Sequence, residues 1–267
     1  MNQTIPDFLI IGVQKGGTTS LYRYLSQHPR IVPAPKKEMH FFDYQFKKGM
    51  DWYRKQFKVP SNKNKRRVLA GEATPYYMAY PHTAARIKET APHVKLIVLL
   101  RNPVDRAYSH YYHEVKRKHE PLSFREAITR EKERLRGERK RMVNDHDYQS
   151  VNYRRYSYLQ RGKYITLLKP WLELFPREQF LFIKSETFFC RPQETLAKVT
   201  SFLGLPKCRF RTDKVHQKGN YEAPLPPNIK KQLQRYFKPY NEKLYETLGI
   251  DFGWDSYDEH ADRVNKR

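Results

Sequence analysis

The chain has 267 residues, of which 39% are hydrophobic and 30% charged, and its 52 Lys and Arg against 28 Asp and Glu give a formal net charge of +24. Two cysteines are too few for a disulfide framework, and no run of about 18 apolar residues predicts a transmembrane helix. The positive charge favours a polyanionic partner: a nucleotide, a nucleic acid, an anionic membrane or an acidic polysaccharide.

The first predicted element is a buried parallel strand over residues 8–13. Its sequence, FLIIGV, is apolar, is rich in β-branched residues and leads into a glycine-containing turn. A helix should follow from Thr18 to about Gln27, before Pro29. The chain therefore opens with a strand, a turn and a helix.

Strands and helices alternate along the rest of the chain. Apolar runs predict strands at residues 68–71, 96–100 and 180–183. Helices are expected from Pro103 towards Lys118 and near residues 83–90, 123–139, 156–175 and 193–202. This alternation predicts an α/β fold, with a central parallel sheet flanked by helices and a ligand crevice at the carboxyl ends of the strands. We expect a single domain over residues 1–267.

The most charged stretch is residues 114–141, with eleven Lys or Arg and six Glu. Phe124, Ala127, Ile128 and Leu135 still form an apolar stripe at helical spacing. The stretch is therefore interpreted either as a solvated helix face or as one wall of an anion-binding cleft.

The turn after the first strand has the features of a phosphate-binding loop. Residues 14–20 read QKGGTTS, so backbone N–H groups and hydroxyls gather at the start of a helix. The Walker A pattern of kinases needs a lysine directly after its last glycine. Counting from Gly12, that position holds Thr18, whereas Lys15 lies in the middle of the loop. The lysine is therefore misplaced for a kinase.

A second anion site is predicted after the strand at residues 96–100. Arg101 lies at the strand end, Ser109 follows about two helical turns later, and Arg106 lies between them. These side chains could converge on one anion.

Residues 6–21 resemble the 5′-phosphosulfate loop of the sulfotransferases that use 3′-phosphoadenosine 5′-phosphosulfate (PAPS), particularly the heparan sulfate branch. Residues 99–111 are similar to the family's 3′-phosphate segment, and residues 218–221, KGNY, resemble the turn that closes over the donor, with Asn220 in place of the usual Arg. The resemblance implies PAPS as the donor and no metal. The implied donor-binding residues are Lys15, Gly16, Gly17, Thr18, Thr19, Ser20, Arg101, Ser109, Lys218 and Gly219.

The same resemblance implies the catalytic residues. Residues 37–43, KEMHFFD, look like a segment of the heparan branch whose glutamate is the proposed base, so Glu38 is the predicted base and His40 the alternative. The resemblance also gives Lys15 the role of steadying the departing phosphate. Residues 71–77 match the family segment after the second strand, but Ala73 replaces a catalytic lysine found in some members. Glu72 and Tyr76 either line the acceptor side or close the strand end.

Three functions remain open at this point. The first is transfer of a sulfuryl group from PAPS to a hydroxyl or amine of a carbohydrate, and the second is transfer to a small natural product or lipid. The third is non-enzymatic binding of a polyanion, favoured by the charge alone. We expect a nucleotide donor and a carbohydrate or small-molecule acceptor as partners, and no nucleic acid.

The remaining expectations concern the cysteines and the compartment. Cys190 and Cys208 are expected to be unpaired thiols, and their spacing matches no metal site. The N-terminus lacks the pattern of a secretion signal, which favours a cytoplasmic protein. The alternative is a Golgi-lumenal catalytic domain whose anchor has been removed.

Overall fold

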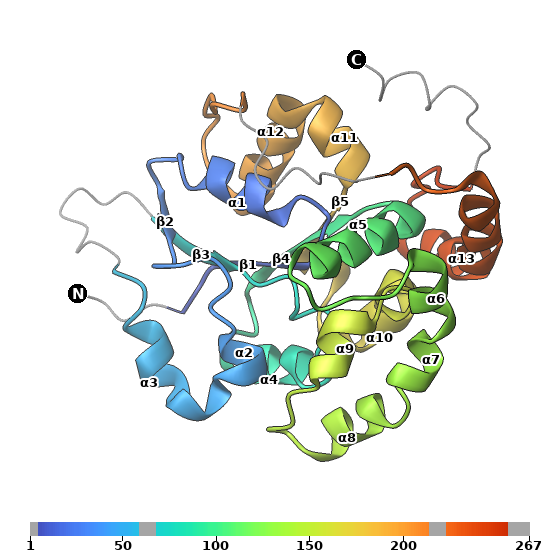
Figure 1. Ribbon diagram of the computed structural model, residues 1–267. Helices are drawn as coiled ribbons and strands as arrows, with labels where there is room; N and C mark the ends of the chain where they lie inside the picture. The colour runs from blue at the N-terminus through green and yellow to red at the C-terminus, as the bar shows by residue number, and fades with distance from the viewer. Residues whose placement is uncertain (1–4, 59–67, 214–222, 256–267) are drawn as a thin grey trace.

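The computed structural model describes residues 5–58, 68–213 and 223–255. Its centre is a five-stranded sheet with the strand order β2-β3-β1-β4-β5, in which every neighbouring pair is parallel (Figure 1). The strands are β1 (Phe8–Gly12), β2 (Ile31–Pro33), β3 (Leu69–Ala73), β4 (Lys95–Leu100) and β5 (Phe180–Lys184). The predicted α/β fold with a central parallel sheet is confirmed.

Helices cover both faces of this sheet, with α1, α11 and α12 on one side and α2, α3, α4 and α10 on the other (Figure 1). The α-helices of the described residues are α1 (Thr18–Leu25), α2 (Phe41–Tyr44), α3 (Gly49–Arg54), α4 (Thr83–Thr90), α5 (Pro103–Lys116), α6 (Phe124–Thr129), α7 (Glu131–Arg134), α8 (Glu138–Asn144), α9 (Val151–Tyr156), α10 (Tyr164–Leu174), α11 (Ser185–Cys190), α12 (Pro192–Leu203) and α13 (Pro227–Leu248). None of them is both long enough and apolar enough to cross a membrane.

Strand β1 separates two hydrophobic cores. Phe8 and Ile10 belong to the core beneath α1 and α12, whereas Leu9 and Ile11 belong to the core beside α4 and α10. All four side chains are fully buried. Successive side chains on a strand point to opposite faces, so a strand buried on both faces must be apolar throughout. This requirement explains the continuous apolar run at residues 8–13.

Two predicted long helices are broken in the structure. The stretch at residues 123–139 runs through three short helices, α6, α7 and α8, and Gly137, which has a left-handed φ of 76°, separates the last two. Residues 156–175 leave the α-helical conformation between α9 and α10, where Gln160–Gly162 form a short 3-10 helix. There Gly162 lies so close to α13 that a Cβ atom would be 2.7 Å from the Phe237 ring. The predictions of single long helices in these two stretches are wrong.

The sheet topology brings the polar segments to one edge. The phosphate loop follows β1, Arg101 follows β4, and Thr74 follows β3. Because all the strands are parallel, these three carboxyl ends meet at the same edge of the sheet, as predicted. The two cysteines, Cys190 and Cys208, are unpaired, which confirms that prediction.

Candidate active site

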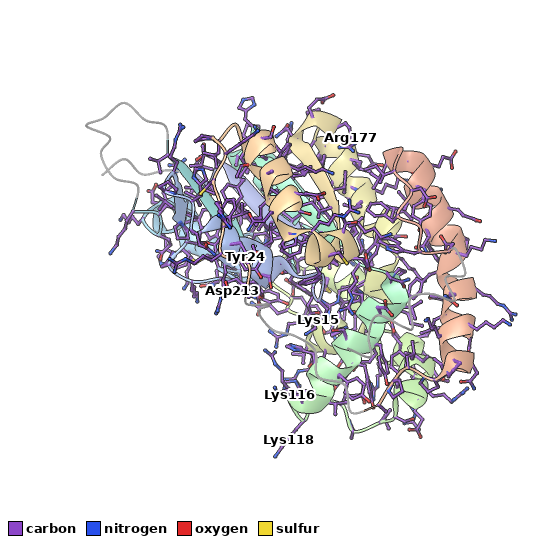
Figure 2. All side chains as sticks on the ribbon, turned by 90° about the horizontal axis from the view of Figure 1, so that it is seen from above. Lys15, Tyr24, Lys116, Lys118, Arg177 and Asp213 are labelled. Carbon is purple, nitrogen blue, oxygen red and sulfur yellow. The ribbon has the colours of Figure 1, made fainter. Side chains whose placement is uncertain are left out.

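A cleft of about 920 Å³ lies at the carboxyl edge of the sheet. Its walls come from the phosphate loop, residues 37–40, helix α5, helix α9 and helix α11. Figure 2 looks down on the molecule and shows Lys15 beside α5, with Lys116 and Lys118 marking the far end of that helix. The cleft therefore occupies the crevice that the sequence predicted.

The phosphate loop has an unusual backbone. Lys15 has φ 72° and Gly17 has φ 92°, both in the left-handed region that L side chains rarely adopt. The Gly16 N–H donates to the Val13 carbonyl at 3.0 Å, which closes the turn. Only glycine suits position 17, because a Cβ atom there would also lie 2.7 Å from the Phe189 ring.

The structure places most, but not all, of the predicted loop residues in the cleft wall. Lys15, Gly17, Thr18 and Thr19 line the cleft, and Thr18 begins helix α1, whose positive dipole end suits an anion. Gly16 and Ser20 do not line it. The Gly16 carbonyl accepts a 2.7 Å hydrogen bond from the Ser185 hydroxyl, and Ser20 is fully buried.

Lys15 lies among other positive groups. Burial, together with the charges of Arg101 and Arg117, lowers its pKa from 10.5 to about 8. The Arg101 guanidinium donates a 3.2 Å hydrogen bond to the Lys15 carbonyl and so couples the two predicted phosphate sites. Bringing these cations together favours a ligand with several negative charges.

Helix α5 supplies the second predicted anion site. Asn102 caps the helix by accepting a 3.0 Å hydrogen bond from the Val104 N–H, and Pro103 occupies the first turn. Arg101 and Ser109 both line the cleft. Arg106 does not: it is 1% exposed, and its guanidinium donates to the Tyr158 carbonyl instead. The expectation that Arg106 converges on the same anion is therefore wrong.

The predicted bases form a chain of charged contacts. His40 Nδ1 lies 2.6 Å from Asp43 Oδ2, and His40 Nε2 lies 3.7 Å from Glu38 Oε2. The Lys37 ammonium contacts the other oxygen of Glu38. Asp43 is completely buried, whereas the Glu38 side chain remains 46% exposed and lines the cleft.

These contacts set the charge of both candidates. Burial acts to raise the pKa of Glu38, but the hydrogen bond from His40 and the charge of Lys37 outweigh it and lower the pKa to about 2. Burial acts to lower the pKa of His40, but Asp43 and Glu38 outweigh it and raise the pKa to about 9. At neutral pH, Glu38 is therefore a carboxylate and His40 an imidazolium.

The backbone around these residues is held by β3 and the turn after it. The Glu38 N–H donates to the Ala73 carbonyl at 3.0 Å, and the His40 N–H points to the Thr74 hydroxyl at 3.5 Å. Glu72 is fully buried and accepts hydrogen bonds from Tyr53 and Tyr77 hydroxyls, each at 2.7 Å.

The structure separates the two residues that were considered for the acceptor side. Glu72 is absent from the cleft wall and supports the strand end, whereas Tyr76 lines the cleft.

Several cleft residues were not predicted. Asp43, which contacts His40 from behind the cleft wall, was visible only as the residue three positions after His40 in a segment already singled out. Helix α5 contributes further cleft residues from the face that carries Ser109, and their helical spacing from Ser109 would have identified them. The charged residues of the cleft wall that the sequence did not single out are Arg23, Lys37, Asp105, Arg154, Arg155, Arg161 and Glu186.

The highly charged stretch at residues 114–141 is divided between its two interpretations. Glu114, Arg117 and His119 line the cleft, whereas residues 124–141 do not. Phe124 and Ala127 are buried, as their helical stripe predicted.

Two predictions concern other parts of the site. Lys218 and Gly219, the predicted closing turn, lie outside the described residues. Within the parts of the chain that the structure describes, no group of three or more His, Cys, Asp or Glu side chains could hold a metal ion.

A cleft that combines a phosphate loop, clustered cations and a carboxylate is typical of a group-transfer enzyme that takes an anionic donor. A model of the sulfotransferase domain family matches residues 5–244. The chain therefore belongs to the sulfotransferase family.

Curated relatives and a solved structure agree with this assignment. The membrane-associated sulfotransferase kil1 of Dictyostelium discoideum is 28% identical over 94% of this chain and 67% of its own length. Heparan sulfate glucosamine 3-O-sulfotransferase 3B1 of Mus musculus is 32% identical over 95% of this chain and 66% of its own length. The chain thus spans about two thirds of the length of these relatives.

The crystal structure of a sulfotransferase from Alicyclobacillus acidocaldarius superimposes with a TM-score of 0.74 at 33% identity, covering 95% of this chain and all of that one. The predicted resemblance to the heparan sulfate branch is confirmed, as is the predicted enzyme class, a PAPS-dependent sulfotransferase.

Proposed function

We propose that this enzyme moves the sulfuryl group of PAPS to a hydroxyl or amine of a carbohydrate by in-line displacement. The observation that carries the proposal is that one cleft contains Lys15 and the start of α1, Arg101 hydrogen-bonded to the Lys15 carbonyl, Ser109, and the Glu38 carboxylate. Two cationic sites suit a donor with phosphates at two positions, which distinguishes PAPS from ATP.

On the donor side, the loop N–H groups and Lys15 would hold the 5′-phosphosulfate. Positive charge is most useful where negative charge accumulates in the transition state, which here is the bridging oxygen of the departing phosphate. Arg101 and Ser109 would bind the 3′-phosphate. The hydrogen bond from Arg101 to the Lys15 carbonyl supports this division, because it fixes the spacing of the two sites.

On the acceptor side, Glu38 is the proposed base. Glu38 is ionised at neutral pH and lines the cleft, whereas His40 is already protonated and cannot act as a base. A carboxylate with a pKa of about 2 is a weak base in the resting enzyme. It can accept the proton because the acceptor hydroxyl becomes strongly acidic as its oxygen bonds to sulfur. His40 and Asp43 would then position Glu38.

The character of the cleft supports a polar acceptor. Eight of its lining residues are Lys or Arg, four are Asp or Glu, and its large apolar side chains are few. An enclosed apolar pocket would have favoured a small natural product or lipid. Arg154, Arg155 and Arg161 also line the cleft. The Arg154 guanidinium lies 6.0 Å from the centre of the Tyr44 ring, which stacks on His40, so the acceptor would extend along this part of the wall.

Two measurements test the proposal. Calorimetry should show tighter binding of 3′-phosphoadenosine 5′-phosphate (PAP) than of ATP, and tighter binding of ATP would refute the donor assignment. Incubation with labelled PAPS and a panel of desulfated heparan sulfate, chondroitin, dextran and 1-naphthol should label a glycan most rapidly. Labelling of 1-naphthol alone would refute the carbohydrate acceptor and leave the donor assignment intact.

A further inference from the structure

Tyr76 is a buried tyrosine whose hydroxyl has no hydrogen-bond partner. Its side chain is 5% exposed, and it lines the cleft. The hydroxyl is excluded from bulk solvent but donates to nothing and accepts from nothing in the structure. Burying a polar group without a partner costs free energy, so buried tyrosine hydroxyls are normally paired.

Other buried tyrosines follow that rule. The hydroxyl of Tyr53 donates to Glu72 at 2.7 Å, that of Tyr158 to Glu120 at 2.8 Å, and that of Tyr164 to the Arg101 carbonyl at 2.7 Å. Tyr153 also has an unpaired hydroxyl, but it does not line the cleft. Tyr76 therefore combines an unpaired buried hydroxyl with a place in the wall of the active site.

The position of Tyr76 relates it to the proposed acceptor side. The Tyr44 ring stacks on His40 with centroids 5.3 Å apart, and the Tyr76 ring lies 5.5 Å from Tyr44. The Arg161 guanidinium lies 5.6 Å from the centre of the Tyr76 ring. Tyr76 thus lies between Arg161 and the Tyr44 ring that stacks on His40.

The neighbours of Tyr76 do not satisfy its hydroxyl. The Tyr44 hydroxyl comes near enough to influence the pKa of Tyr76, but the two groups do not meet hydrogen-bond geometry. Arg161 is already held by Ser157, His110 and the Arg154 carbonyl. Burial raises the pKa of Tyr76 well above its ordinary value, so the hydroxyl keeps its proton and can donate it to a ligand.

We propose that the Tyr76 hydroxyl binds the acceptor by donating a hydrogen bond to an oxygen beside the reacting group. This inference rests on the proposed function, and it deepens it: a carbohydrate carries such oxygens on neighbouring carbons, whereas a simple alcohol does not. Tyr76 is then a specificity-determining residue that favours polyhydroxylated acceptors over compounds with a single hydroxyl.

The substitution Tyr76→Phe tests this inference because its effects on stability and on transfer should have opposite signs. Removing an unpaired buried hydroxyl should leave the melting temperature unchanged or raise it. The same change should raise the acceptor KM for glycans of the panel by roughly 3- to 10-fold, the worth of one neutral hydrogen bond. The KM for 1-naphthol and the affinity for PAP should change less than about twofold.

Tyr111→Phe is the matched control, because the Tyr111 hydroxyl donates a 2.9 Å hydrogen bond to the Leu122 carbonyl away from the cleft. It should lower the melting temperature and leave the acceptor KM unchanged. A Tyr76→Phe enzyme that melts as early as the control, or that keeps the wild-type KM for glycans, would overturn the inference. A wild-type enzyme that binds PAP but labels no glycan would refute the proposed acceptor class, and the Tyr76 contact with it.

Discussion

The pKa of Lys15 gives a prediction about donor binding that needs no acceptor. Burial and the charges of Arg101 and Arg117 lower this pKa from 10.5 to about 8 in the free enzyme. A bound donor places phosphates beside the ammonium, which stabilises the charged form and raises the pKa again. Donor binding must therefore be accompanied by proton uptake at pH values near and above 8.

The size of the effect follows from the fraction of charged Lys15. With a pKa of about 8, roughly nine tenths of the free enzyme carries the charge one pH unit below that value, and roughly one tenth carries it one unit above. If only the charged form binds, the affinity for PAP falls about tenfold over these two units. The phosphates of PAP are ionised throughout this range, so they contribute little.

Calorimetry with PAP at a series of pH values measures this fall, and repeating each titration in buffers of different ionisation enthalpy measures the protons taken up. Lys15→Arg is the matched control: it keeps the charge at every accessible pH, so the affinity should become nearly independent of pH. The reasoning would be refuted if the wild-type affinity were flat across this range, or if the arginine variant showed the same fall.

Three further predictions concern the other charged groups of the cleft. Arg101→Ala should weaken PAP binding by roughly 10- to 100-fold, Ser109→Ala should weaken it less, and neither should affect AMP much, because AMP lacks the 3′-phosphate; equal losses for both nucleotides by calorimetry would contradict the assignment. Glu38→Gln should lower kcat by about 100-fold or more while PAP still binds normally. Sulfuryl transfer at the wild-type rate with saturating donor would instead assign the role of base to His40. The charge of His40 stabilises the fold fully below its ordinary pKa of 6.5, and that stabilisation is lost as the pH rises through about 9. Asp43→Asn should therefore reduce the loss of folding stability at alkaline pH, as measured by urea unfolding. An unchanged pH profile would show that Asp43 does not set the charge of His40.

The sequence was sufficient to predict the sheet because its strands are buried on both faces. The runs at residues 8–13 and 96–100 are apolar on both faces of the strand. Between predicted helices, such a run is typical of a central strand that is buried on both sides. Strand β2 was not predicted, because Ile31–Pro33 is only three residues long and ends in a proline at the edge of the sheet.

The site was predictable where local chemistry defines it and not where distant segments meet. Lys15 and Arg101 were found because each follows a recognisable strand. Arg161 and Arg154 gave no such signal, because they reach the cleft only through tertiary packing: Arg161 belongs to a short 3-10 helix, Gln160–Gly162, that packs against α5, and Arg154 belongs to α9. Arg106 shows the converse: its spacing placed it near Ser109, but the helix turns it away from the cleft towards the Tyr158 carbonyl.

The backbone itself marks the site independently of any motif. Among the described residues, four that are not glycine have a positive φ, and three of them, Lys15, Glu38 and His40, line the cleft. Glycine would adopt each of these conformations at a lower cost, so the side chains must contribute something that outweighs the strain. The strain is maintained by the sheet, since the Glu38 N–H is held by the Ala73 carbonyl at the end of β3. The residues proposed to steady the leaving phosphate and to accept the proton are thus the residues whose backbones are held in place before any ligand arrives.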